Sequence, residues 1–321
     1  MNGEASGAKV YGLHAAVIAL LFALNFLLPE YHHGVMARVM VLAVFAMGYN
    51  LLFGYAGLLS LGHAMFFAAG MYGAGLPVYH FGLGVAPAFL SGIVCGAVLA
   101  LAIGLLALRT TGVAFMIVTM MFAQVLFLVI LYFGAMTGGD QGLVLQQAQR
   151  RMEIGPMVLD LTNPATRYMI AFFLFSVVLL ITVALVRSAF GRVLVAIREN
   201  EERTRMLGYD AFANKLVAVM VSGAICAASG AAYGLLFGYV GSNFASVQYS
   251  ILPLLWVLLG GAATTLGPLL GTLFMYYIVD ITSGYTSAWL LVVGIALILL
   301  VLYFPKGVLG TLRDRFVRWL P

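Results

Sequence analysis

Long apolar runs separated by short polar connections dominate this chain. No Asp, Glu, Lys or Arg occurs between Val39 and Leu108. A helix needs about 20 apolar residues to cross a bilayer core of about 30 Å, and about 17 to 25 are tolerated. The run at 249–263 is short, so it predicts either a span or a re-entrant or broken helix. The pattern as a whole predicts ten membrane-spanning helices, at 13–28, 36–53, 63–80, 86–108, 111–133, 168–186, 214–240, 249–263, 266–282 and 286–304.

Composition fixes the class of protein. Hydrophobic residues make up 64% of the 321 residues and charged residues 8%, whereas a soluble domain carries about 25% charged residues. The sequence therefore predicts an all-α polytopic membrane protein. Cys95 and Cys226 both fall in apolar runs, which argues against a disulfide or a metal site. The first apolar run follows Lys9 and lacks a small-residue cleavage pattern, so we interpret it as a retained first span.

The distribution of basic residues predicts the orientation in the membrane. With the N-terminus inside, ten spans place 12 of the 16 Lys and Arg residues in the cytoplasm. Basic residues are enriched in cytoplasmic loops, so both termini are predicted to be cytoplasmic. The net charge of +5 is explained by this topology, and nucleic acid is not needed as a partner. The basic residues left outside are Arg38, Arg150, Arg151 and Arg167.

One short repeat suggests two related halves. LLFGYAG at 51–57 recurs as LLFGYVG at 235–241, with six identities in seven. Each copy ends the second span of a five-span half, and an odd number of spans gives the two halves opposite orientations. We therefore predict two inverted five-helix repeats. The divisions are a first transmembrane half at 1–133, an external connection at 134–167, and a second half at 168–321 that includes a cytoplasmic segment at 187–215.

That cytoplasmic segment concentrates charge as no other part of the chain does. Ten charged residues lie between Arg187 and Lys215. Leu194 and Ile197 form an apolar stripe, and Arg198–Glu202 and Glu201–Arg205 are spaced as i, i+4 helical pairs. With Gly208 as its C-terminal cap, the pattern predicts a helix over about 190–207 along the membrane surface. Such a helix is either a docking element for a cytoplasmic subunit or a solvated loop with ordinary surface pairs.

Several blocks together resemble a known family. The sequence FGRVLVAIRENEERTRMLGYD at 190–210, GYAGLLSLGHAMFFAAGMYGAG at 54–75, TGGDQGL at 137–143, LLGGAATTLGP at 258–268 and YFPKGVLG at 303–310 is similar to permease subunits of branched-chain amino acid ABC importers, the LivM/LivH type. The resemblance implies a type II ABC importer fold, a second homologous permease, cytoplasmic ABC ATPases that use ATP, and an external solute-binding protein. It also implies that residues of the charged segment couple to the ATPase: Arg192, Arg198, Glu199, Glu201, Glu202, Arg205 and Gly208.

Two departures from the family leave the solute open. Thr264 and Thr265 stand where the family more often has a Gly-Ser-type turn, and TGGDQGL replaces TGGSDGL. The resemblance and the charge-poor lining favour import of a small, nearly neutral solute, branched-chain or other apolar amino acids first. The alternatives are a urea or short-amide ABC permease and a passive channel or secondary carrier for a small polar solute. The expected location is a bacterial-type inner membrane.

Glycine-broken stretches at matching places of the two halves indicate a solute path. Broken backbone at membrane depth survives only where protein buries it or where it lines a water-filled path. Gly and Ser also allow close helix packing in lipid, which is the competing explanation. His63 is as suited to capping a helix end as to any pH-dependent role. The candidate path residues are Gly54, Tyr55, Gly57, Ser60, His63, Tyr239, Ser242 and Asn243.

Two further Gly-rich turns are predicted, one on each side of the membrane. The turn Gly138, Gly139, Asp140 is predicted outside, where it contacts an external binding protein or lines the mouth of the path, although turn chemistry alone also explains it. The turn at 260–268 is predicted to be structural, at the cytoplasmic side.

The missing motifs narrow the function. There is no GxxxxGK[ST], nucleophile elbow or HExxH, so the chain is predicted to be a transport subunit with no enzyme activity, no metal and no cofactor of its own. Asp280 is the one acidic residue within a predicted span. A proton-coupled carrier normally uses such buried ionisable groups, so this class is disfavoured.

Overall fold

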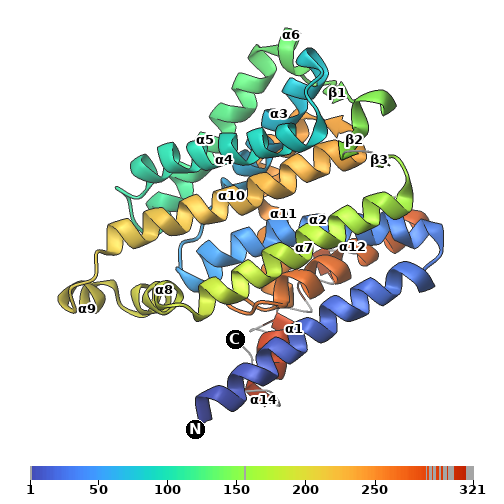
Figure 1. Ribbon diagram of the computed structural model, residues 1–321. Helices are drawn as coiled ribbons and strands as arrows, with labels where there is room; N and C mark the ends of the chain where they lie inside the picture. Colours follow the sequence, from blue (N-terminus) through green and yellow to red (C-terminus); the bar gives the residue numbers. More distant parts are fainter. Residues whose placement is uncertain are drawn as a thin grey trace.

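A computed structural model describes residues 2–154, 157–286 and 307–315, together with a few residues between 288 and 302. The described part is mostly helical (Figure 1). The long helices are α1 (Asn2–Leu27), α2 (Glu30–Asn50), α3 (His63–Phe81), α4 (Val85–Ala107), α5 (Val113–Tyr132), α7 (Pro164–Arg187), α10 (Ala211–Phe237), α11 (Val247–Gly260) and α12 (Gly267–Tyr285). The shorter ones are a π-helix (Leu51–Tyr55), α6 (Gly134–Thr137), α8 (Ala189–Glu199), α9 (Glu201–Met206), 3-10 turns at Gln147–Arg150 and Ser242–Ala245, and α14 (Gly307–Arg315).

The chain is a multi-pass membrane protein by the length and composition of its helices. In the part of the chain that the structure describes, six helices are long and apolar enough to cross a membrane, namely Lys9–Leu27, Glu30–Tyr55, Val85–Ala107, Val113–Tyr132, Pro164–Arg187 and Ala211–Phe237. The predicted spans at 63–80, 249–263 and 266–282 are also helical, as α3, α11 and α12, but do not count among these six. The predicted span at 286–304 lies outside the continuously described residues.

Helices α2 and α10 form the centre of the bundle (Figure 1). α10 packs on α3 and α4 along one side and on α2 along the other, and α2 also contacts α7, α11 and α12. Small residues let these helices approach closely, because a Cβ added to Gly70 or Gly230 would collide with the facing backbone. Ser222 and Ser229 donate hydrogen bonds of 2.6 Å to Gly48 O and Val41 O of α2. α2 and α10 are therefore joined by hydrogen bonds from serine side chains to backbone carbonyls as well as by apolar packing.

The two ends of the bundle differ. Helices α8 and α9 lie at one end, which we call the charged face, and the 134–162 connection lies at the other, the opposite face (Figure 1). The opposite face contains two small antiparallel sheets, which the sequence did not predict. β1 (Leu143–Val144) pairs with β4 (Tyr239–Val240), and β2 (Arg151–Ile154) pairs with β3 (Met157–Asp160). The first pairing ties the connection to the end of α10.

Both long central helices are followed by a turn back into the bundle. After the π-helix the chain returns so that His63, the first residue of α3, lies beside Ser222, about 16 Å along α10 from its start. After α10 the chain returns similarly, and α11 begins at Val247. The two returning segments meet, because the Ala64 N–H donates a 2.9 Å hydrogen bond to Ser250 Oγ of α11. α3 and α11 therefore begin inside the protein.

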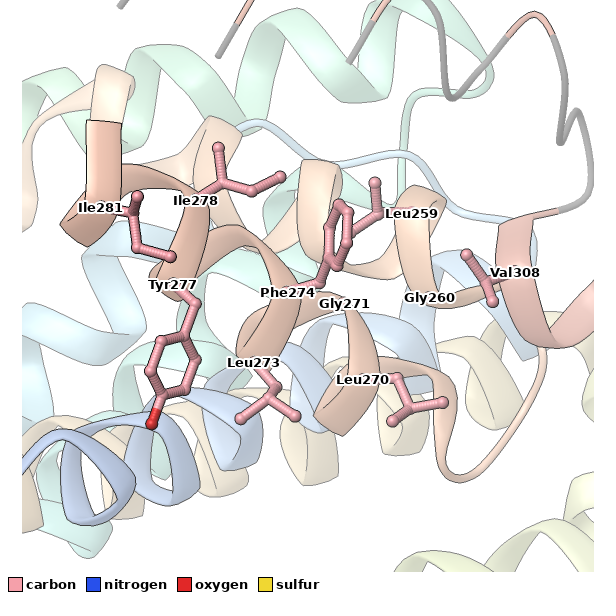
Figure 2. A pocket seen from close by; sticks show the side chains of 10 residues that line it. All are labelled: Leu259, Gly260, Leu270, Gly271, Leu273, Phe274, Tyr277, Ile278, Ile281 and Val308. Carbon is pink, nitrogen blue, oxygen red and sulfur yellow. The ribbon is translucent and has the colours of Figure 1, made fainter. Parts of the chain in front are cut away.

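An apolar groove runs along α12 (Figure 2). It has a volume of about 410 Å³ and is lined by Leu, Ile, Phe, Val and Gly side chains of α11, α12 and α14, with Tyr277 contributing the hydroxyl shown in Figure 2. Such a lining suits hydrocarbon contact. None of the predicted path residues lines this groove.

Candidate functional site

Three consecutive helix starts shape the charged face. Ser188 accepts a hydrogen bond from Gly191 N at the start of α8, Asn200 accepts one from Arg203 N at the start of α9, and Asp210 accepts one from Ala213 N at the start of α10. Ser, Asn and Asp are strong N-caps because their side-chain oxygens bind otherwise unpaired backbone N–H groups. The segment therefore changes direction at each of these residues.

The predicted single helix over 190–207 was wrong. Asn200 has φ −160° and ψ 103°, so the chain is extended between α8 and α9. Asn is a poor residue for a helix interior because its side chain competes for backbone N–H groups. The break also removes the predicted Arg198–Glu202 pair, and Arg198 instead forms a 2.7 Å ion pair with Glu199. The predicted cap is confirmed, since Gly208 has φ +89° and donates to Arg205 O.

α8 packs its apolar stripe against the bundle and exposes its charged residues. Leu194 and Ile197 are buried as predicted, next to the buried Gly191. Ion pairs connect α9 to α10, because the carboxylate of Glu201 pairs with Arg205 at 2.6 Å and also with Lys215 of α10. Burial raises the pKa of Glu201, but the hydrogen bond and charge of Lys215 and the charge of Arg205 outweigh it and hold that pKa below its usual value. The exposed predicted coupling residues are Arg192, Arg198, Glu199, Glu202, Arg205 and Gly208.

Arg198 connects this segment to the first copy of the repeat. Its guanidinium Nη1 donates a 2.5 Å hydrogen bond to Gly54 O, inside the π-helix that ends α2. A Cβ added to Gly57, which has φ +71°, would lie 2.5 Å from Arg198 Cγ. π-Helical turns within α-helices often occur at functional sites. Arg198 therefore points into the protein at the place where α2 is irregular.

Asn50 extends the connection to the second half of the chain. It immediately precedes the π-helix, and its side chain donates to Thr264 O at 2.9 Å and accepts from Ala263 N at 3.0 Å. Residues 261–266 form the turn between α11 and α12. Thr265 Oγ1 in this turn lies 2.7 Å from His14 Nε2 of α1. A continuous set of contacts therefore runs from α8 through the end of α2 to the α11–α12 turn.

The predicted path residues are distributed along the protein and do not form one cluster. Gly54 and Gly57 lie at the charged face against Arg198, whereas Tyr239 lies at the opposite face and donates to Gln141 O. α10, about 40 Å long, separates these two groups. The hydroxyl of Ser60 accepts a local hydrogen bond from the Gly62 N–H. Tyr55 and Ser242 are buried, and Asn243 is exposed in the 3-10 turn before α11.

His63 has a packing role in this structure. It is fully buried as the first residue of α3, with Nε2 3.0 Å from Ser222 Oγ and its ring 4.7 Å from the ring of Tyr49. Ser222 in turn donates to Gly48 O. The histidine therefore joins α3 to both central helices at the point where the chain returns. Among the described residues, no group of His, Cys, Asp and Glu is placed to hold a metal.

A glycine-rich turn at 137–142 lies at the opposite face. Gly138, Gly139 and Gly142 all have positive φ, and Thr137 Oγ1 donates to Ile130 O and accepts from Gly139 N. Turn geometry thus accounts for this motif, and Asp140 is left exposed at its tip. Close by, the buried Arg150 donates to Leu235 O, Leu236 O and Leu161 O.

Sequence reasoning missed several residues that organise these faces. Arg150 and Asn50 act through backbone carbonyls and amides far away in the sequence, and no local pattern reveals such partners. An exposed apolar cluster on the charged face was also missed. Met206, Leu207 and Tyr209 are 84%, 71% and 49% exposed. The sequence signal was available, because MLGY follows directly on the charged run.

Comparison with known proteins finds relatives of one kind. The chain is 25% identical over 334 residues to the high-affinity branched-chain amino acid transport system permease protein LivM of Salmonella typhimurium, covering 98% of this chain and 78% of that protein. It is 24% identical to the LivM protein of Escherichia coli, covering 94% and 75%. A probable LivM of Methanocaldococcus jannaschii is 30% identical over 141 residues, covering 39% and 41%. No solved structure gives a significant match.

The family comparison covers most of the chain. The sequence model described as "Branched-chain amino acid transport system / permease component" matches residues 31–302. This range includes both copies of the repeat, the charged segment and the α11–α12 turn. The chain therefore belongs to the family of permease components of branched-chain amino acid transport systems.

Proposed function

We propose that this chain is the membrane subunit of an ATP-driven importer that moves a small, nearly neutral solute, branched-chain or other apolar amino acids first, into the cytoplasm. The observation that carries the proposal is the contact between Arg198 of α8 and Gly54 of the π-helix, in a chain of this family. It links an extramembrane amphipathic helix to an irregular point in a central span. A passive channel has no need of that link.

The exposed side of the charged face is the proposed ATPase contact. Met206, Leu207 and Tyr209 offer apolar area beside exposed charges of α8 and α9, and apolar anchors surrounded by polar residues are typical of protein interfaces. ATP-driven closure of the partner ATPases moves α8, and Arg198 and Asn50 transmit the displacement to α2 and the α11–α12 turn. The energy comes from different binding of ATP in the two states of the cycle.

The finer architecture follows from the same proposal. We assign ten spans in two inverted halves, 1–133 and 168–321, with the charged face in the cytoplasm and the 134–167 connection outside. The turns after α2 and α10, which return into the bundle at opposite faces, support the inverted relation. The assembly comprises a homologous permease, ABC ATPases and an external solute-binding protein that contacts Gly138, Gly139 and Asp140, in a bacterial-type inner membrane.

Reconstitution of the complete assembly tests the function. Proteoliposomes containing both permeases, the ATPases and the binding protein are expected to take up labelled leucine only with ATP, and to prefer leucine to urea and glutamate. Preferential ATP-dependent uptake of glutamate contradicts a nearly neutral solute, and a preference for urea contradicts an amino acid importer. Uptake of leucine without ATPase subunits contradicts the energy source.

Single-cysteine labelling tests the orientation. In a background without Cys95 and Cys226, an impermeant reagent added outside is expected to label a cysteine replacing Asp140 and to spare one replacing Arg203. Both positions are exposed in the structure, so a difference in labelling reports the side of the membrane. Labelling of the Arg203→Cys variant from outside contradicts the assignment.

A further inference from the structure

Arg38 is an exposed charge in a span that is otherwise buried over most of its length. Every residue of α2 from Val35 to Asn50 is buried except Arg38. Arg38 lies about 12 Å along the helix from Glu30, at the opposite face. An ionisable residue inside a membrane span is costly and usually faces water, a counter-charge or a transported solute.

The surroundings of Arg38 contain aromatic rings and a second cation. Its guanidinium carbon lies 5.0 Å from the ring centre of Phe237, at the end of α10, and Nη1 donates a 3.3 Å hydrogen bond to Tyr276 OH of α12. Arg167 of α7 lies over the same Phe237 ring at 5.2 Å. Two guanidinium groups, from α2 and α7, therefore lie against one aromatic ring of α10, and α12 contributes the tyrosine hydroxyl beside them.

Among the described residues, no acidic side chain lies within ion-pair distance of either cation. The ion pairs found among the described residues all lie in the segment from Arg198 to Lys215, at the charged face. The acid nearest along α12, Asp280, accepts a 2.8 Å hydrogen bond from Tyr31 instead. The positive charge extends to Arg150, whose pKa is lowered by burial and further by the charge of Arg167, with Asp160 acting in the opposite direction. The charge of Asp280 acts on Arg38 without forming an ion pair, so Arg38 keeps N–H donors that no carboxylate of the described residues occupies.

We propose that Arg38, assisted by Arg167, receives the carboxylate of the transported solute at the opposite face. Arginine presents five N–H donors in a planar fork that matches a carboxylate, and Tyr276 accepts from only one of them. Phe237 and Tyr276 supply an apolar wall for a neighbouring side chain. A carboxylate beside an apolar contact describes an amino acid with an apolar side chain, so this inference rests on the proposed function and deepens it.

The depth of Arg38 favours a small molecule over a protein loop or a lipid headgroup. A docked protein reaches the outer end of α2 more easily than a residue about 12 Å along the helix from that end. Arg151, on β2 at the same face, is exposed and lies outside the spans. It is therefore a matched control for chemistry at an arginine that receives no solute.

Chemical protection tests the site without requiring transport. The complete importer is treated with phenylglyoxal, which modifies accessible arginines, and modification of Arg38 and Arg151 is followed by peptide mass spectrometry. Leucine is expected to slow modification of Arg38 but not of Arg151, and leucinamide, which lacks the carboxylate, is expected to have no effect. Equal protection by leucine and leucinamide, or none by either, overturns the proposal. Protection of Arg38 in an importer that fails to take up leucine would refute the proposed function and leave the carboxylate site standing.

Charge rescue tests whether transport uses the cation. In the background lacking Cys95 and Cys226, Arg38→Cys is expected to lower ATP-dependent leucine uptake about tenfold, the factor that 1.4 kcal/mol represents. An aminoethyl methanethiosulfonate reagent, which restores a positive charge, is expected to restore most of the uptake, and the sulfonatoethyl reagent is not. Arg151→Cys is expected to respond to neither.

Two outcomes of the rescue experiment overturn the proposal. One is complete aminoethyl labelling of the Arg38→Cys variant without recovery of uptake. The other is a loss of binding-protein affinity for the permease complex that parallels the loss of uptake, for solute-loaded and empty binding protein alike. The second result would assign Arg38 to a protein contact.

Discussion

The two copies of the LLFGY sequence end their helices at opposite faces, and each is held by an arginine from a distant segment. At the opposite face, Arg150 is 8% exposed and donates to three backbone carbonyls, two of them in the second copy. At the charged face, Arg198 donates one hydrogen bond to Gly54 O in the first copy, and its side chain is 33% exposed and shared with Glu199. One arginine is enclosed by protein and the other lies at the surface.

This difference separates a buried contact from a partly exposed one. Breaking the Arg150 contacts removes the donor of three carbonyls, whereas breaking the Arg198 contact removes the donor of one, and the Arg198 guanidinium keeps its pair with Glu199. The backbone differs accordingly. The first copy continues as a π-helix, whereas in the second Gly238 turns at φ +72° and Tyr239 enters a strand. Identical residues therefore give a π-helical end with one partly exposed arginine contact at the charged face and a tight turn with buried arginine contacts at the opposite face.

The largest expected effect is on stability, from Arg150→Ala. Removal of a buried cation that caps α10 is expected to lower the free energy of unfolding by about 3 kcal/mol, the scale of hydrogen bonds to a charged group. Equilibrium unfolding of the purified protein in mixed micelles measures this. Arg151→Ala, its exposed neighbour, is the control, with an expected change of about 0.5 kcal/mol or less. Equal losses from both variants would remove the distinction between the two faces.

The next effect is on coupling, from Arg198→Ala. The variant is expected to fold with a stability change of about 1 kcal/mol or less, because the contact is partly exposed. Leucine uptake per ATP hydrolysed is expected to fall about tenfold, since α8 is then disconnected from the π-helix. Arg109→Ala, at an exposed arginine between α4 and α5, is the control. Unchanged coupling in the Arg198 variant would show that the contact transmits nothing.

The pattern of the chain predicted the helices well, but it did not predict their partners. Leu194 and Ile197 were placed correctly because apolar periodicity reports burial directly. The break at Asn200 was missed because i, i+4 charge spacing was given more weight than the N-cap preference of Asn, which the structure shows to be stronger here. Arg150 and Arg198 bind main-chain carbonyls, and every residue has one, so their sequence carries no mark of the partner.

The predicted path residues show the same limit. Tyr55 and Tyr239 occupy matching positions in the repeat, and this match identified two irregular helix ends correctly as places of special backbone. The match did not predict the distance between these two ends, which is set by the length of α10. Arg38 was counted only as an outside charge, because its exposure within a buried helix depends on how α7, α10 and α12 are packed.

A glycine pair sharpens the comparison at smaller magnitude. Gly57→Ala is expected to lower the free energy of unfolding by about 1 to 2 kcal/mol from its positive φ and to displace Arg198, whose Cγ would be 2.5 Å from the new Cβ. Gly82→Ala has φ +62° and no heavy atom within 4 Å, so it carries the backbone cost alone. Loss of leucine uptake is therefore expected only for Gly57→Ala. Equal uptake by the two variants would contradict a role for the Arg198 position.

The smallest expected effect is a pH dependence at the charged face. The folded pKa of Glu201 is held below its usual value by Lys215 and Arg205, although burial acts the other way. A carboxyl group with a lowered folded pKa contributes stability above its unfolded pKa, about 4.3, and loses that contribution as the pH falls through the folded value. Glu201→Gln is therefore expected to lower the thermal stability of the solubilised protein at pH 7 and to leave it unchanged relative to the native chain in strong acid. Glu202→Gln, exposed and without an ion pair among the described residues, is the control, and melting curves across this pH range make the comparison. Parallel curves for the native chain and the Glu201 variant would mean that the ion pairs do not fasten α9 to α10, and the charged face would then be held by Arg198 and the apolar stripe of α8.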